Sequence, residues 1–197
     1  MLIDILKANI GNPITPELAA DIMLAADQIS TLIPFDVIER IKPEQYLGLS
    51  FAVEYIEDIA EEIKPLHRAH WNETEASRHG IELNPDYELF FKYERAGRFI
   101  LFTLRKEERL LGQCSMYLSE SAHTKTLIAT EDALYLCPEA RKGRTAMRFV
   151  RYVEESLRQL GAREIEISVK MTNKAGKFFE FLGYRQVEVG LKKVMEG

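Results

Sequence analysis

A basic segment at positions 134–146 has the residue types and the spacing that an anion site requires. It reads Leu134-Tyr-Leu-Cys-Pro-Glu-Ala-Arg-Lys-Gly-Arg-Thr-Ala146, and a long amphipathic stretch follows it. We interpret it as a buried strand, a proline turn and a basic loop that opens a helix. The first N–H groups of a helix have no partner and the helix dipole is positive there, so the loop predicts a phosphate site. Its charge comes from Arg141, Lys142 and Arg144.

Three titratable residues precede this loop. Glu131 and Asp132 are consecutive, so in a strand their side chains point to opposite faces, and one of them should face a cleft. We expect Asp132 to share its face with Leu134, and Glu131 to share its face with Tyr135. His123 lies in the loop before the strand, and an unperturbed imidazole titrates near pH 6.5, roughly the range that proton transfer needs.

The hydrophobic pattern predicts the elements that position these residues. Apolar residues at helical spacing indicate helices at about 15–29, 54–70, 87–96, 147–160 and 173–182. Runs typical of strands lie at about 47–53, 99–104, 110–118, 127–136, 165–169 and 187–191. This order predicts an α/β (α+β) fold with a mixed, mostly antiparallel twisted sheet and helices on both faces. We divide the chain into an N-terminal helical extension, residues 1–45, and one domain, residues 46–197.

Composition and charge argue against several classes of protein. The sequence has no apolar run near the roughly 18 residues needed to span a membrane, and its N-terminus lacks the features of a signal peptide. Cys114 and Cys137 are isolated, which favours a reducing, cytoplasmic location and no metal site of the CxxC type. Residues 1–62 carry 3 basic and 12 acidic side chains, a net charge of −9. Because the basic residues gather in one place, no broad nucleic-acid surface is expected.

The element order and the basic loop resemble the GNAT family of acyl-CoA-dependent N-acetyltransferases. The resemblance covers roughly residues 47–195 and leaves 1–45 outside. The family's pyrophosphate loop reads Arg/Gln-x-x-Gly-x-Gly/Ala, and the segment Arg141-Lys142-Gly143-Arg144-Thr145-Ala146 matches its first and last positions. Here Gly143 stands one position early, and Arg144 takes the usual glycine place. The segments 66–73 and 132–141 resemble GNAT proteins encoded by phages and prophages.

A second motif lies near the C-terminal end. The segment Asn173-Lys-Ala-Gly-Lys-Phe-Phe-Glu-Phe-Leu-Gly-Tyr184 resembles the family's Asn-x-x-Ala…Tyr-x-x-x-Gly-Phe ending. In the family the asparagine contacts the pantetheine arm or the adjacent backbone, which implies that role for Asn173. The family's tyrosine often protonates the departing thiolate, and this chain has Phe179 in its place. A thiol of pKa about 8.5 can leave as the thiolate without much help.

The resemblance implies acetyl-CoA as cosubstrate, no metal, and direct attack of an amine on the thioester. The oxyanion that forms would be stabilised by a backbone N–H near Leu136. A carboxylate or histidine would take the proton from the ammonium. The candidates for this base, in our order of preference, are Asp132, Glu131 and His123. The implied cosubstrate contacts are Leu136, Arg141, Lys142, Gly143, Arg144, Thr145, Ala146 and Asn173. The implied acceptor contacts, from the family's substrate lip, are Trp71, Glu73 and His70.

We therefore predict an N-acetyltransferase whose acceptor is an amine of a small molecule or of a protein lysine or N-terminus. One alternative is a non-catalytic acyl-CoA-binding or protein-interaction module on the same fold, since a fold alone does not determine function. Another is an assembly protein whose N-terminal helix docks a partner or a second copy. A homodimer is compatible with the resemblance. His67 and His70 lack a spaced third ligand, so a structural role is favoured over a metal site.

Overall fold

The computed structural model describes residues 2–74, 82–171, 173–191 and 193. The helices are α1 (Leu2–Ala8), α2 (Pro16–Ser30), α3 (Phe35–Ile38), α4 (Ala60–Thr74), α5 (Tyr87–Arg95), the 3-10 helix η1 (Pro138–Arg141), α6 (Thr145–Gln159) and α7 (Ala175–Leu182). The strands are β1 (Glu44–Tyr46), β2 (Leu49–Glu54), β3 (Phe99–Lys106), β4 (Arg109–Glu120), β5 (Leu127–Leu136) and β6 (Ala162–Glu166).

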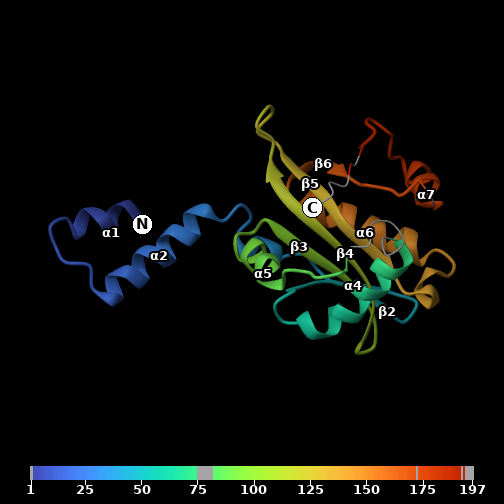
Figure 1. Ribbon diagram of the computed structural model, residues 1–197, viewed down its shortest axis with the longest axis horizontal. Coiled ribbons are helices and arrows are strands. Elements are labelled where there is room, and N and C mark those ends of the chain that lie inside the picture. Colours follow the sequence, from blue (N-terminus) through green and yellow to red (C-terminus); the bar gives the residue numbers. More distant parts are fainter. Residues whose placement is uncertain (1, 75–81, 172, 192, 194–197) are drawn as a thin grey trace.

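The strands form one sheet in the order β1-β2-β3-β4-β5-β6 (Figure 1). Neighbours are antiparallel from β1 to β5, whereas β6 runs parallel to β5. The last pair between β5 and β6 joins Thr130 to Glu166, although β5 continues to Leu136. Beyond Thr130 the two strands separate, so the second half of β5 has no strand partner on that side among the described residues.

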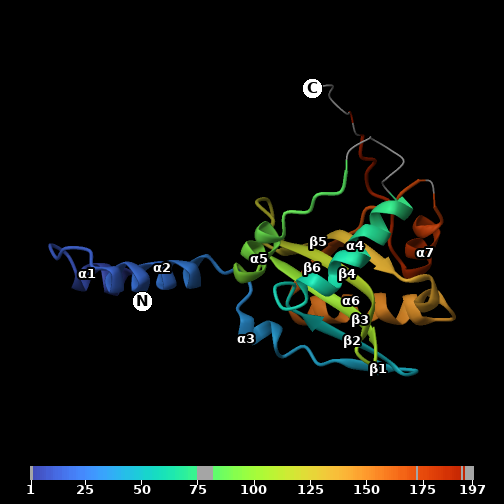
Figure 2. The ribbon, with the colours of Figure 1, turned by 60° about the horizontal axis from the view of Figure 1, so that its bottom comes forward.

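Helices cover both faces of the sheet, as Figure 2 shows. On one face α6 buries Phe149, Val153 and Leu157 against the strands, at the spacing of one helix face. On the other face Ile63 and Leu66 of α4 form a second core together with α5 and the strands. The predicted fold class, a mixed and mostly antiparallel sheet between helices, is confirmed.

Helices α1 and α2 lie to one side of the sheet in both views (Figures 1 and 2). Thr15 begins α2 as predicted, because its hydroxyl accepts a hydrogen bond from the Leu18 N–H at 3.2 Å. The chain that leads from α2 to the sheet is fixed where the Leu32 N–H donates to the Ala96 carbonyl at 2.9 Å. None of the helices that the structure describes is long and apolar enough to cross a membrane.

The helix predicted at 54–70 begins later than expected, at Ala60. Glu54 ends β2, and the chain then turns because the buried Glu94 carboxylate accepts hydrogen bonds from the N–H groups of Ile56 and Glu57, at 2.7 and 3.2 Å. Burial raises the pKa of Glu94 to about 7. Local periodicity does not predict this turn, since its carboxylate comes from 38 residues further along the chain.

The prediction of a last strand at 187–191 is wrong. Residues 184–191 form neither helix nor strand, and Val187, Val189 and Leu191 are 90%, 66% and 96% exposed. The predicted strand at 165–169 is present only as its first residues, within β6. An alternating pattern becomes a strand only where a neighbouring strand takes its hydrogen bonds, and no described strand pairs with 184–191.

Replacing Gly97 with alanine is expected to lower the free energy of unfolding by about 2 kcal/mol or more. Gly97 has a φ of +61°, and a Cβ atom placed on it would lie 2.1 Å from the Ile33 carbonyl oxygen. Gly48 is the matched control, because its φ is +77° and nothing lies within 4 Å of its Cβ position. Gly48→Ala should cost only about 1 kcal/mol. Urea unfolding checks both variants, and equal losses would contradict the close packing of Ile33 on Gly97.

Candidate active site

Glu131 and Asp132 face opposite sides of the sheet, and a β-bulge at Asp132 changes which later residues share their faces. In β4 the neighbouring residues Met116 and Ser115 pair with Glu131 and Ala133 of β5. Asp132 lies between these two partners and is therefore an extra residue in β5. The prediction that the two carboxylates face opposite ways is confirmed. The bulge inverts their expected neighbours, because Leu134 shares a pocket with Glu131, whereas Tyr135 belongs to the core under α4.

Asp132 lies on the α4 face beside β4. The Ser115 hydroxyl donates a hydrogen bond to its carboxylate at 3.2 Å. Burial raises the pKa of Asp132 above its ordinary value, while the Ser115 hydrogen bond and the nearby His67 partly offset this. A carboxylate whose pKa is raised toward neutrality is better suited to accept a proton from an ammonium group than an ordinary surface aspartate.

A buried polar network joins α4, α5 and β4 next to Asp132. His67 Nδ1 lies 2.9 Å from the Tyr87 hydroxyl, and His67 Nε2 lies 3.1 Å from Gln113 Oε1. Burial lowers the pKa of His67, and the hydrogen bond to Gln113 and the nearby Asp132 offset this only in part. Gln113 is fully buried, and its Nε2 has no hydrogen-bond partner among the described residues. These are donors and acceptors that a bound polar group or a water can use.

Sequence reasoning missed Gln113 and Ser115 as parts of the site. A signal was present, because the two polar residues alternate with apolar ones in a strand that is otherwise apolar. For His67 the sequence favoured a structural role over a metal site, and it did not predict the contacts with Tyr87 and Gln113. Within the described part of the chain, no group of three or more histidine, cysteine, aspartate or glutamate residues could hold a metal ion.

Glu131 lies at the point where β5 and β6 separate. Its carboxylate accepts a hydrogen bond from the Ser168 N–H at 3.3 Å and thereby bridges the two diverging segments. Around it is an enclosed apolar pocket formed by β4, β5, α6 and α7, with Phe179 and Tyr184 among the lining side chains. Burial, more than any other influence, raises the pKa of Glu131 to about 7. Glu131 is therefore a second candidate base, on the face opposite Asp132.

The loop between η1 and α6 has the features of an anion site. Gly143 has a φ of +62° with open space around it, and no side chain caps the first N–H groups of α6. Lys142 and Arg144 are exposed, and within the described residues they form no salt bridge. Thr145 is buried at the start of α6, and Ala146 packs against the core, which fixes the loop on the sheet. A diphosphate fits this donor set.

Arg141 differs from the expectation, because it points toward α4. Its Nε donates to the Leu136 carbonyl oxygen at 2.7 Å, and its two terminal nitrogens each donate to one carboxylate oxygen of Glu73, both at 2.7 Å. The guanidinium also lies over the Tyr135 ring, 5.1 Å from its centre. In this structure the Arg141 guanidinium is therefore paired with Glu73 at the C-terminal end of α4.

The remaining candidates His70 and Trp71 lie in α4, and Asn173 lies just before α7. The His70 ring is 5.5 Å from the Tyr135 ring, centre to centre, and Trp71 lies partly buried in α4. Asn173 precedes α7, where its side-chain oxygen accepts a hydrogen bond from the Ala175 N–H at 2.9 Å. Lys174 is the N-cap of α7, so this contact lies in the turn just before the helix.

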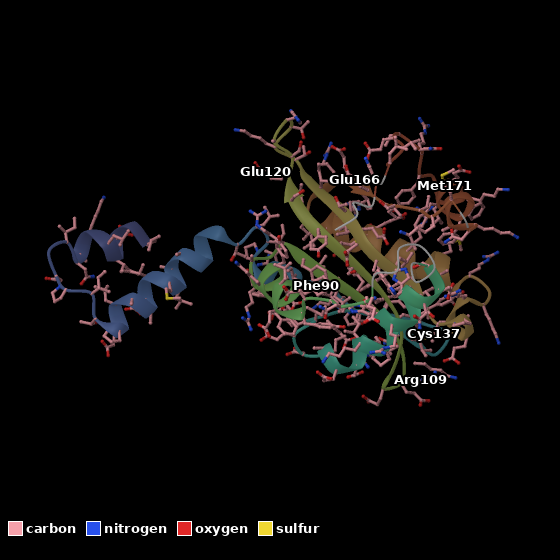
Figure 3. The ribbon with its side chains drawn as sticks, in the orientation of Figure 1. Phe90, Arg109, Glu120, Cys137, Glu166 and Met171 are labelled. Atoms are coloured by element: carbon pink, nitrogen blue, oxygen red, sulfur yellow. The ribbon has the colours of Figure 1, made fainter. Side chains whose placement is uncertain are left out.

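His123 lies away from the other candidates. It is exposed in the loop between β4 and β5, at the end of β5 remote from the phosphate loop. Figure 3 shows this separation: Glu120, just before the loop of His123, lies at one end of the sheet, and Cys137 lies toward the other. His123 is therefore the weakest of the three candidates for the base.

The comparisons with known proteins agree with this geometry. Residues 54–184, two thirds of the chain, match the model of the Acetyltransferase (GNAT) family. The chain belongs to this family. No curated protein matches the sequence at a significant level.

Solved structures share the fold at low identity. An aminoglycoside acetyltransferase from an uncultured soil metagenomic sample is 14% identical, with a TM-score of 0.63, over 76% of this chain and 100% of its own. The ribosomal-protein-alanine N-acetyltransferase of Brucella melitensis biovar Abortus 2308 is 14% identical, with a TM-score of 0.60, over 76% and 98%. A putative acetyl transferase of Pyrococcus furiosus is 22% identical, with a TM-score of 0.55, over 74% and 99%. At these identities the likeness shows the fold alone.

Replacing Ser115 with alanine is expected to raise the pKa of Asp132 further. The Ser115 hydroxyl stabilises the ionised carboxylate, so its loss favours the protonated form. The measurement is the pH titration of the Asp132 carboxyl carbon by NMR. Ser119→Ala is the control, because Ser119 pairs with Ile128, away from Asp132. An Asp132 pKa that falls or stays constant in Ser115→Ala would contradict the hydrogen bond.

Proposed function

We propose that the protein transfers an acetyl group from acetyl-CoA directly to an amine. One observation carries this proposal: the second half of β5, free of β6, has a carboxylate on each face and leads straight into the basic loop at the start of α6. One strand thereby joins a phosphate site to a pair of proton acceptors. Membership of the GNAT acetyltransferase family supports the same reaction.

The loop residues and the separated strands would hold the cosubstrate. Lys142, Arg144 and the N–H groups at the start of α6 would bind its diphosphate. The pantetheine arm would follow the free side of β5 toward Glu131, close to Asn173 and α7. When bound, acetyl-CoA supplies an activated thioester. The other contributions to the reaction come from side chains and backbone of this chain.

Asp132 is our first candidate for the residue that takes the proton from the acceptor ammonium. It lies on the face covered by α4 and α5, the side on which Trp71, His70 and Glu73 are found. Only a neutral amine attacks a thioester, so the base must act before or during attack. Glu131 would serve this role if the amine arrived from the opposite face, which carries α6 and α7.

The chain lacks a tyrosine in the place where the family often has one to protonate the thiolate. Phe179 is buried and has no hydroxyl. The neighbouring Tyr184 directs its hydroxyl to Glu154, and burial, followed by Glu154, raises the pKa of Tyr184. Neither residue is therefore a ready acid. A thiol of pKa about 8.5 gives a stable thiolate, so CoA can leave without being protonated first. We therefore expect turnover without a dedicated acid.

The acceptor that we propose is an amine of a small molecule or of a protein. The relatives in solved structures include proteins named for aminoglycosides and for ribosomal-protein alanine, both of which present amines. The charge of −9, from 3 basic and 12 acidic residues in 1–62, would favour a cationic acceptor where these residues border the acceptor site, whereas the part of it in α1 and α2 lies to one side of the sheet. We further propose residues 1–45 as an extension to the domain, a cytoplasmic location, and a homodimer as the assembly to test.

A second candidate function is acyl-CoA binding without catalysis. Phe179 favours it, because the residue that often serves as the acid in the family is missing. The two functions separate in a coupled assay of thiol release. The panel contains an aminoglycoside, an alanyl peptide, free lysine and spermidine, each with acetyl-CoA. Release above the rate of spontaneous hydrolysis supports the enzyme, and binding without release supports the module.

Reversing charge on the loop is expected to weaken CoA binding by at least tenfold. The variant is Lys142→Glu/Arg144→Glu, and the measurement is calorimetric titration with CoA. Arg158→Glu/Arg163→Glu is the matched control, because it makes the same change of net charge at exposed positions near the far end of α6. A similar loss of affinity in both variants would attribute the effect to net charge and contradict a site at the loop.

Asp132→Asn is expected to lower kcat by about 100-fold or more while CoA affinity changes little, because the amide cannot take a proton. Glu131→Gln is the comparison on the other face, where we expect a smaller loss. The measurement is the rate of thiol release with the best acceptor of the panel. A large loss in Glu131→Gln with normal turnover in Asp132→Asn would assign the base to Glu131 instead.

A further inference from the structure

The Arg141–Glu73 clamp, defined as this ion pair and its contacts, connects the two halves of the candidate active site. Glu73 lies in the last turn of α4, and Arg141 ends η1 directly before the loop. All three guanidinium nitrogens are engaged, one by the Leu136 carbonyl and two by the Glu73 carboxylate. The clamp therefore ties the end of the acceptor-side helix to the start of the phosphate loop.

The clamp is stronger than a typical surface ion pair but accessible to solvent. Its geometry is bidentate, and the guanidinium lies over the Tyr135 ring. Glu73 stands at a helix C-terminus, where the dipole disfavours a carboxylate, and hydrogen bonding to Arg141 lowers the pKa of Glu73. The Arg141 and Glu73 side chains are still 39% and 45% exposed, so another anion can reach the guanidinium.

A diphosphate at the loop would compete with Glu73 for the same arginine. Arg141 adjoins Lys142 in sequence, and its fork of donors fits a phosphate as well as a carboxylate. The diphosphate carries two negative charges, whereas a carboxylate carries one, and it offers more acceptor oxygens. The edge formed by the two terminal nitrogens holds one anion at a time in a bidentate contact, so a phosphate bound at this edge would displace Glu73.

We propose that the diphosphate of the cosubstrate opens the Arg141–Glu73 clamp, and that the released Glu73 carboxylate then contacts the cationic acceptor. This inference rests on the proposed function. It makes the protein bind its cosubstrate before its acceptor, because Glu73 is neutralised until phosphate takes Arg141. Glu73 is thereby a specificity residue for positively charged amines and not part of the proton transfer.

The first test measures CoA affinity by calorimetry in the wild type, Glu73→Gln and Glu139→Gln. Glu139 is the matched control, because it pairs with Arg109 at 2.9 Å beside the same loop and is 49% exposed. We expect Glu73→Gln to bind CoA about threefold to tenfold more tightly, since Arg141 no longer has to leave a carboxylate. Glu139→Gln should change the affinity less than about twofold, because Glu139 is exposed and pairs with Arg109 and not with Arg141.

The outcomes separate the clamp from the proposed function. Equal tightening in both variants, or no tightening in Glu73→Gln, overturns the clamp while leaving the cosubstrate site in place. If none of the three proteins binds CoA, the proposed function is overturned, and with it the proposal that Arg141 moves from Glu73 to the diphosphate. Unfolding in urea confirms that Glu73→Gln is folded before its affinity is interpreted.

The second test uses the acceptor from the thiol-release panel that reacts fastest. Glu73→Gln should raise the KM for this amine by about tenfold, with kcat within about twofold of the wild type, because the carboxylate binds the cation without moving its proton. Glu73→Asp, which keeps the charge, should recover part of the loss. An unchanged KM in Glu73→Gln overturns the acceptor contact.

Discussion

The separation of β5 from β6 is the constraint on which the rest of the structure depends. A parallel pair that ends at Thr130 leaves the second half of β5 without a described strand on that side, where unpaired backbone groups are costly unless another group, such as Arg141 at the Leu136 carbonyl, uses them. Glu131 and Asp132 lie just beyond this point and alternate between the two faces, and the bulge at Asp132 sets which later residues of β5 share each face. The same strand then runs into the loop at the start of α6. Phosphate site, free strand and proton acceptors are thus positioned by one segment of about ten residues.

Burial of polar groups around this segment follows the same logic. The Glu94 carboxylate is buried where it fixes the turn before α4. Its two hydrogen bonds offset only part of the free energy of desolvation, and its pKa is therefore raised. The His67–Gln113 contact adds a polar link between α4 and β4 to the apolar packing of Ile63 and Leu66 on the strands. Groups buried in this way specify the position of α4, and α4 in turn carries Glu73 to Arg141. The acceptor side is therefore built by long-range polar contacts.

Local patterns predicted the parts of the fold that local physics controls. The hairpin of β3 and β4, the strand β5, and α6 with its apolar face follow from periodicity. Periodicity did not predict the start of α4, which depends on Glu94, or the neighbours of Glu131 and Asp132, which depend on a bulge. The segment 187–191 has the pattern of a strand but no described partner. The loop was found from its charges, whereas the partner of Arg141, Glu73, lies 68 residues away in sequence.

The most direct test of this account is an NMR titration of the labelled protein with acetyl-CoA, following backbone amide signals. Binding at the free side of β5 predicts the largest shifts at residues 131–136 and 142–146, with little change in α1, α2 or β1. A hydrogen bond or a nearby diphosphate alters these amides directly, whereas remote elements feel only small indirect effects. Shifts confined to other surfaces, or no shifts at saturating acetyl-CoA, would contradict the claim that the separated strand and the basic loop form one cosubstrate site.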